Sequence, residues 1–151
     1  MDSGTLGIRS LTPADRSSWA SLWFDYLAFY ETALDEIVYD TTFSAFFKDD
    51  PNGPHCLLAE KEGRIIGLVH HLFHAHCWRP EGICYLQDLF VAPEARGSGA
   101  GRALIESVYQ AADAKGVPNV YWLTQDFNLT ARRLYDSVGQ VTPFLKYTRP
   151  I

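Results

Sequence analysis

Apolar and aromatic residues near the N-terminus recur at steps of three and four, the spacing of one face of a helix. Just before this stripe, Thr12-Pro13-Ala14-Asp15 supplies the hydroxyl, the proline and the acid that are typical of a helix start. The stripe consists of Trp19, Leu22, Trp23, Tyr26, Phe29 and Tyr30. It has two interpretations: residues that pack in the core, or, because tyrosine and tryptophan have polar tips, the wall of a binding cleft.

Farther along the chain, short apolar runs bounded by turn residues predict strands, and longer periodic segments predict helices. The expected strands are Leu6 to Leu11, His55 to Glu60, Arg64 to Phe73, Ile83 to Val91, Val120 to Thr124 and Phe144 to Arg149. The later helices are expected at Thr42 to Phe47, Gly99 to Lys115 and Leu129 to Val138. Hairpin strands followed by alternating helices and strands indicate an α/β (α+β) fold, with helices on both faces of one mixed sheet.

Length and composition favour a single domain over residues 1–151, because 47% of the chain is apolar and domains hold roughly 100–200 residues. No apolar run approaches the ~20 residues that cross a bilayer, and Met1-Asp2-Ser3-Gly4 lacks the basic start of a leader. We therefore expect a cytoplasmic protein with no membrane partner. Cys56, Cys77 and Cys84 lack zinc-ligand spacing and are expected to be buried thiols in a reducing compartment.

The net charge of −5 argues against nucleic acid as a partner and favours cationic ligands such as amines. By contrast, the segment from Arg96 to Arg102, with glycines at 97, 99 and 101, is suited to an anion. It leaves a predicted strand and opens a predicted helix, so that its backbone N–H groups can hold a phosphate. The segment has neither the Lys-Ser/Thr ending of a mononucleotide loop nor the last glycine of a dinucleotide fingerprint.

Two spaced motifs resemble the GNAT superfamily of N-acetyltransferases. Arg96-x-x-Gly99-x-Gly101, directly after Asp88-Leu89-Phe90-Val91, resembles its acetyl-CoA loop. Asn128-x-x-Ala131-x-x-Leu134-Tyr135-x-x-x-Gly139 resembles its second motif on the CoA side. The aromatic stripe is similar to the fungal histone, polyamine and D-amino-acid acetyltransferases. Tyr85-Leu86-x-Asp88-Leu89-Phe90-Val91 is similar to the spermidine/spermine and thialysine enzymes.

This resemblance implies a mostly antiparallel sheet of about six or seven strands, acetyl-CoA as co-substrate and no metal. It also implies a homodimer, in which the strand from Phe144 to Arg149 could pair across subunits. The implied acetyl-CoA residues are Leu89, Phe90, Val91, Arg96, Gly97, Ser98, Gly99, Ala100, Gly101, Arg102 and Asn128. The first three are expected on a strand splayed by a bulge, where their backbone would polarise the thioester carbonyl.

Tyr135 is the expected general acid, because a phenol is protonated at neutral pH and can reprotonate a departing thiolate. The general base is open. The polyamine enzymes carry a carboxylate where this chain has Gln87, which leaves Asp88 as base or substrate anchor and Glu31 as a second candidate. The expected substrate-binding residues are Gln87, Asp88, Tyr30, Glu31 and Trp78, the last as an aromatic wall for a cationic amine.

The histidines at 70, 74 and 76 allow three interpretations: a metal site, histidines that line the substrate or a subunit interface, or surface positions. For the whole chain, the expected function is acetyl transfer from acetyl-CoA to the primary amine of a polyamine, an amino acid or a thialysine-like compound. The alternatives are acetylation of protein or histone lysines, and a non-catalytic module that binds acyl-CoA and regulates a partner.

Overall fold

A five-stranded sheet forms the centre of the computed structural model, which describes residues 4–151. Its strands, in spatial order, are β1 (Gly7–Ser10), β2 (His55–Lys61), β3 (Arg64–His76), β4 (Arg79–Val91) and β5 (Val120–Tyr121). The first four pair antiparallel and β5 pairs parallel to β4. The mixed, mostly antiparallel sheet is therefore confirmed, although it has fewer strands than expected. Met1, Asp2 and Ser3, used above to argue against a leader, lie outside the described residues.

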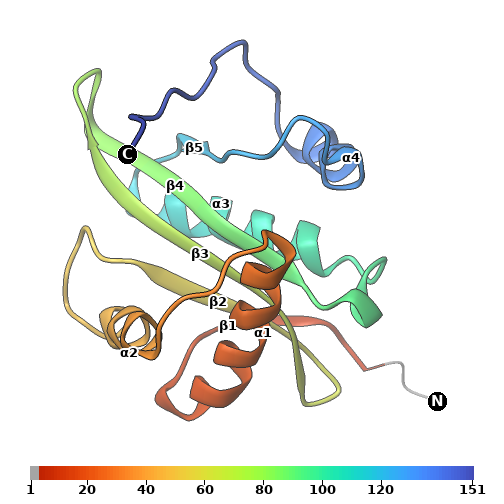
Figure 1. Cartoon of the computed structure of the whole chain (residues 1–151). Coiled ribbons are helices and arrows are strands. Elements are labelled where there is room, and N and C mark those ends of the chain that lie inside the picture. The colour runs from red at the N-terminus through yellow and green to blue at the C-terminus, as the bar shows by residue number, and fades with distance from the viewer. Residues whose placement is uncertain (1–3) are drawn as a thin grey trace.

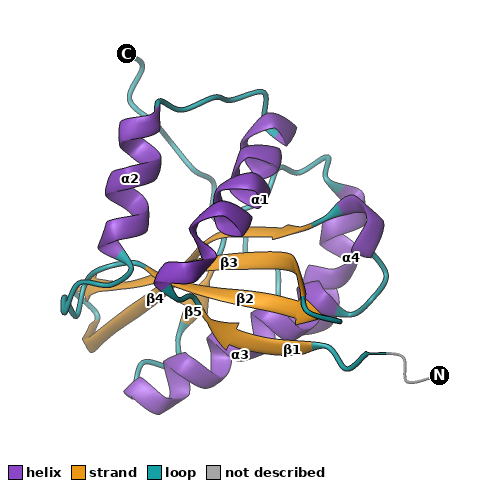
Figure 2. Cartoon of the chain, turned by 90° about the horizontal axis from the view of Figure 1, so that it is seen from below, coloured by secondary structure: helices purple, strands orange, loops and turns teal. Residues whose placement is uncertain are grey.

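Helices cover both faces of the sheet, as the alternation of elements predicts. Figure 2 shows α1 (Arg16–Phe29) and α2 (Glu36–Ala45) on one side of the strands and α3 (Ala100–Lys115) on the other. The last helix, α4 (Leu129–Val138), packs beside α3. Single 3-10 turns, Pro13–Asp15 and Pro93–Ala95, precede α1 and the loop before α3. The second helix begins six residues earlier than the expected Thr42, because Asp35 and Glu36 supply an acidic start. None of the helices within residues 4–151 is long and apolar enough to cross a membrane.

Each face of the sheet has its own apolar core. Trp19, Leu22, Trp23 and Leu27 of α1 are buried against the first face, together with Leu58, Leu68 and Phe90 of the strands. On the second face, Leu104, Ile105, Val108 and Ala112 of α3 pack on Val69, Phe73 and Leu86. Two of the three thiols, Cys56 and Cys84, are buried as expected, whereas Cys77 is exposed because it lies in the β3–β4 turn.

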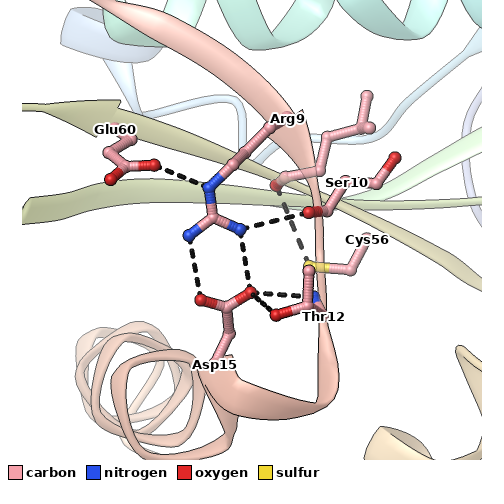
Figure 3. Close-up of polar contacts among 7 residues, drawn as sticks. Arg9, Ser10, Thr12, Asp15, Cys56 and Glu60 are labelled. Carbon is pink, nitrogen blue, oxygen red and sulfur yellow. Dashed lines mark hydrogen bonds and ion pairs between the residues drawn. The ribbon is translucent and has the colours of Figure 1, made fainter. Parts of the chain in front are cut away.

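A polar cluster fixes the start of α1 to the edge of the sheet (Figure 3). The Arg9 guanidinium donates to both oxygens of Asp15 at 2.8 and 2.9 Å, and its Nε donates to Glu60 at 2.6 Å. Asp15 also accepts from the backbone N–H and the hydroxyl of Thr12, so the predicted helix-start residues bond to one another. These donors hold the pKa of the Asp15 carboxyl well below its usual range.

The expected last strand is wrong. Residues 140–151 form no helix or strand between α4 and the C-terminus (Figure 1). Phe144, Leu145 and Tyr147 are between 80% and 90% exposed. The apolar pattern of this segment gives it strand propensity, but no strand within residues 4–151 pairs with it.

Candidate active site

The candidate site begins at the point where β4 is no longer paired with β5. β5 pairs with β4 only through Cys84 and Tyr85, so the following part of β4 has one open edge. On its other edge, the register with β3 shifts between His70 and His71, which leaves Gln87 as an extra, bulged residue. The expected bulge is therefore present, just before Leu89, Phe90 and Val91. These three residues line a cavity of about 530 Å³.

The glycine-rich loop forms one end of this cavity. Gly97 and Gly99 both have positive φ angles, +80° and +86°, a conformation that side-chain-bearing residues adopt at a cost. A Cβ atom at either position would meet nothing within 4 Å, so both glycines face open space. Among residues 4–151, no acceptor bonds to the N–H groups of Gly97, Gly99 and Gly101, whereas those of Ser98 and Ala100 bond locally.

Three free N–H groups at a helix start, with Arg96 and Arg102 in the same cavity wall, fit the diphosphate of a CoA molecule. Arg102 is partly engaged already, because it donates to the Ser137 hydroxyl at 2.7 Å.

Helix α4 forms the next wall. Asn128 caps it by accepting from the Ala131 N–H at 3.4 Å, and both residues line the cavity with Leu134 and Tyr135. Leu134 approaches α3 closely, since a Cβ on Gly101 would lie 3.0 Å from it. Burial, with a smaller effect of Tyr30, raises the pKa of Tyr135 to about 12, so its hydroxyl is a proton donor at neutral pH.

Helix α1 closes the cavity from the other side. Tyr26, Phe29 and Tyr30 line it, whereas Trp19 and Trp23, earlier in the same stripe, are buried in the core. Both interpretations of the stripe thus apply, each to a different part of the helix. Tyr26 and Phe29 line the cavity, and the sequence indicated this only through the interpretation of the stripe as the wall of a cleft.

Asp88 lies directly behind this wall. The bulge at Gln87 turns Asp88 to the α1 face of the sheet, while Leu86 points into the α3 core. The Asp88 side chain is 13% exposed and its Oδ2 lies 2.8 Å from Nδ1 of His70. Burial and the Asp88 charge raise the pKa of Tyr26 and of Tyr30, which places the carboxylate next to both phenols.

Of the expected substrate residues, Tyr30 lines the cavity, whereas Asp88, Gln87, Glu31 and Trp78 do not. Gln87 is exposed at the bulge, and Glu31 is exposed just after α1 with a φ of +54°. Trp78 is 84% exposed in the β3–β4 turn, beside His76. Of the histidines, His70 is buried and bonds to Asp88, and His74 bonds to the Tyr121 hydroxyl at 2.8 Å. Residues 4–151 contain no group of three or more His, Cys, Asp or Glu side chains placed to hold a metal ion.

The sequence is similar to one protein family and to acetyltransferases from several organisms. The family described as "Acetyltransferase (GNAT) family" matches residues 17–139. The D-amino-acid N-acetyltransferase HPA3 of Saccharomyces cerevisiae is 37% identical over 143 residues, 94% of this chain and 89% of that protein. The thialysine N-epsilon-acetyltransferase of Bos taurus is 33% identical over 93 residues, 56% of this chain and 54% of that protein.

Solved structures have the same fold. The ribosomal-protein-alanine N-acetyltransferase from Brucella melitensis biovar Abortus 2308 has a TM-score of 0.81 at 18% identity, covering 97% of this chain and 99% of that one. AAC(6')-Iy, in complex with a bisubstrate analogue of CoA and acetylneamine, has a TM-score of 0.82 at 16% identity, again covering 97% and 99%.

Proposed function

The chain belongs to the acetyltransferase (GNAT) family, and on this premise we propose that it acetylates the primary amine of a small cationic substrate. The family uses acetyl-CoA, so the chain is an acyltransferase. The observation that supports the proposal is the continuous cavity that joins the glycine loop, the open edge of β4, Tyr135 and the aromatic end of α1.

Each wall of the cavity has a proposed role. The thioester of acetyl-CoA supplies the acetyl carbonyl. The N–H groups of Gly97, Gly99 and Gly101 bind the diphosphate, and the open backbone of β4 at residues 89–91 orients and polarises the carbonyl. Tyr135 donates its proton to the sulfur as the carbon–sulfur bond breaks, and it regains a proton from the nitrogen, which loses its second proton as the amide forms. Asp88 binds the incoming ammonium group and takes up the proton that this group must lose before its nitrogen can attack, directly or through water.

A small amine is the substrate class that the site favours. The wall opposite α4 is aromatic and has a carboxylate behind it, which suits a compact cation. The relatives named above act, by their names, on D-amino acids and on thialysine, both small amines. Acetylation of lysine in a protein tail is the alternative.

A panel of acceptors tests this proposal. It comprises spermidine, D- and L-amino acids, thialysine, an aminoglycoside and a histone peptide, with CoA thiol release as the readout. We expect turnover with at least one of the small amines and little with the peptide. Turnover of the peptide alone would overturn the proposed substrate class.

A matched pair of glycine variants tests the diphosphate site. Gly99 and Gly116 lie at opposite ends of α3, both with positive φ angles of +86° and +78°, so alanine strains the backbone equally at either. Only Gly99 lies in the cavity wall. We expect Gly99→Ala to weaken CoA binding at least tenfold by calorimetry and Gly116→Ala to leave it unchanged. Equal affinities would exclude this loop as the binding site.

We further propose that the protein is a homodimer. Phe144, Leu145 and Tyr147 form an exposed apolar segment after α4, which a second subunit could cover. Sedimentation of the full chain should give a dimer, and of a chain ending at residue 140 a monomer. A full chain that sediments as a monomer would refute this proposal.

We also propose that the enzyme acts in the cytoplasm. Cys56, Cys77 and Cys84 are all free thiols, which suits a reducing compartment. Fluorescence microscopy of the tagged full chain, expressed in the organism that produces it, tests this location.

A further inference from the structure

We propose that Trp19 and His70 are positioning residues for acetyl transfer, which together hold the Asp88 carboxylate in the orientation that binds the amine. The inference rests on the proposed function, because the amine-binding role of Asp88 comes from there. Neither Trp19 nor His70 lines the cavity. Both act on the substrate only through Asp88.

A chain of two hydrogen bonds, the first buried and the second partly buried, links the three residues. The Trp19 indole Nε1 lies 2.9 Å from Nε2 of His70, and Nδ1 of His70 lies 2.8 Å from Oδ2 of Asp88. Trp19 is fully buried and His70 is 4% exposed, so water does not compete for these bonds. They join α1 to the neighbouring strands β3 and β4, and the first bond links residues 51 positions apart in the sequence.

The chemistry of the donors fixes the direction of both bonds. An indole N–H can only donate, so Nε2 of His70 must be the acceptor and carry no proton. The imidazole proton therefore sits on Nδ1 and is donated to Asp88, which gives a neutral ring in the Nδ1–H tautomer. In this arrangement Trp19 selects the one tautomer of His70 that can bond to the carboxylate.

Packing prevents the imidazole from turning away. The His70 ring packs against Phe46, at 5.0 Å, and against Trp23, at 5.7 Å between ring centroids. One carboxylate oxygen of Asp88 is thus held by a fixed donor. The same carboxylate lies beside the cavity-lining Tyr26 and Tyr30, and, after burial, both its charge and a hydrogen bond to Tyr26 contribute to the raised pKa of Tyr26. We assign the ammonium group to the Asp88 oxygen on this side.

A neighbouring tryptophan provides a matched control for Trp19. Trp23 is also buried on α1, stacks on Trp19 at 5.0 Å and contacts His70, but its buried Nε1 has no hydrogen-bond partner among residues 4–151. Changing either tryptophan to phenylalanine removes a similar volume from the same core. Only Trp19→Phe also removes a hydrogen bond to His70.

The His70 variants separate the hydrogen bond from packing. In His70→Asn, the amide N–H₂ replaces Nδ1 at the same distance from Cβ and can still donate to Asp88. In His70→Leu, a side chain of similar size has no donor. The assay measures kcat and KM with acetyl-CoA and the best acceptor of the panel, and the affinity for CoA by calorimetry.

We expect His70→Leu to lower kcat/KM for the amine by about 100-fold, as a misplaced reacting group typically does, with CoA affinity unchanged. His70→Asn should recover at least tenfold of that loss. Trp19→Phe should lower kcat/KM about tenfold, whereas Trp23→Phe should remain within about twofold of the wild type. Equal kinetics of the two tryptophan variants, or of His70→Leu and the wild type, would overturn the inference.

Asp88→Asn distinguishes the failure of this inference from the failure of the proposed function. If Asp88→Asn is inactive while His70→Leu is fully active, the role of Asp88 stands and the positioning role of His70 is refuted. If Asp88→Asn keeps the wild-type kcat/KM, the amine-binding role of Asp88 fails and the inference fails with it.

The tautomer of His70 in the wild-type protein is a further readout. Nitrogen-15 NMR of the histidine rings at pH 7 should show one ring, identified by its loss in His70→Asn, with Nδ1 protonated and Nε2 unprotonated. A His70 ring that is protonated on Nε2 would refute the arrangement.

Discussion

Tyr135→Phe removes a single oxygen from the wall of the cavity and tests the proposed general acid. The ring keeps its environment, because its main aromatic contact is the edge of Trp122, at 5.6 Å between centroids. No partner within residues 4–151 is hydrogen-bonded to the Tyr135 hydroxyl, so phenylalanine leaves no buried group unpaired. The free energy of unfolding should therefore change by less than about 1 kcal/mol.

The expected loss of turnover follows from the acidity of the phenol. Proton transfer by a positioned side chain contributes about 10²–10⁴-fold to a rate, or about 2.7–5.4 kcal/mol. Burial raises the pKa of Tyr135 to about 12, whereas an ordinary thiol has a pKa of about 8.5. Because transfer from this phenol to a free thiolate is uphill, we expect the lower end of the range, a decrease in kcat of about 100-fold.

The assay combines CoA thiol release with calorimetry and a control tyrosine. Tyr109 of α3 donates its hydroxyl to the backbone oxygen of Val138 at 2.7 Å and does not line the cavity. Tyr109→Phe should lose about 1 kcal/mol of stability but keep its turnover, the reverse of Tyr135→Phe. In the wild type, Tyr135 should cause no alkaline loss of kcat below about pH 11, since its pKa is about 12. A Tyr135→Phe enzyme with CoA affinity and kcat both within twofold of the wild type would remove Tyr135 from the acid role.

Three further predictions concern the fold that supports the site. Asp15 has a folded-state pKa below its usual range, so it stabilises the fold above about pH 4 and this stabilisation is lost at lower pH. Asp15→Asn should lower the free energy of unfolding in urea by about 1–3 kcal/mol at pH 7 and by less at pH 3; equal losses would contradict this. Burial, then nearby charges, lowers the pKa of His71 to about 4. Below about pH 6.5 the unfolded chain alone takes up this proton, so up to about 3 kcal/mol of stability is lost between pH 6.5 and 4. Thermal melts of His71→Leu should show a weaker dependence over that interval, and an unaltered slope would exclude His71 as its source. A Cβ on Gly139 would lie 2.7 Å from the Trp122 ring, so Gly139→Ala should cost about 1–3 kcal/mol in urea unfolding, whereas no change would show that the ring moves freely.

Features with a strong local signal could be predicted from the sequence. The glycines at 97 and 99 occupy positive φ angles before α3, and the pattern of Leu104, Ile105 and Val108 places one face of that helix on the sheet. The start of α1 follows from the bonds among Thr12, Asp15 and their neighbours. Such features depend on residues a few positions apart, where residue type limits the backbone.

Features that depend on distant partners could not be predicted in this way. The segment from Phe144 to Arg149 has apolar and aromatic residues that favour a strand, but pairing needs a neighbour, and no strand within residues 4–151 pairs with it. The bond between Trp19 and His70 joins residues 51 positions apart. Trp78 is exposed because β3 and β4 both extend farther toward the turn between them than their apolar residues predict.

The bulge at Gln87 links both halves of the proposed site. Without an extra residue, strand alternation would place Leu86 and Asp88 on one face, and a carboxylate would then enter the apolar core against α3. With the extra residue, Leu86 stays in that core, while Asp88 faces His70 and Phe90 faces Tyr26. The same irregularity lies where β4 parts from β5 and its edge becomes open. The inserted residue therefore accounts for the carboxylate behind the aromatic wall, and the short β5 accounts for the unpaired backbone beside it, so neither half of the site could be predicted from the strand pattern alone.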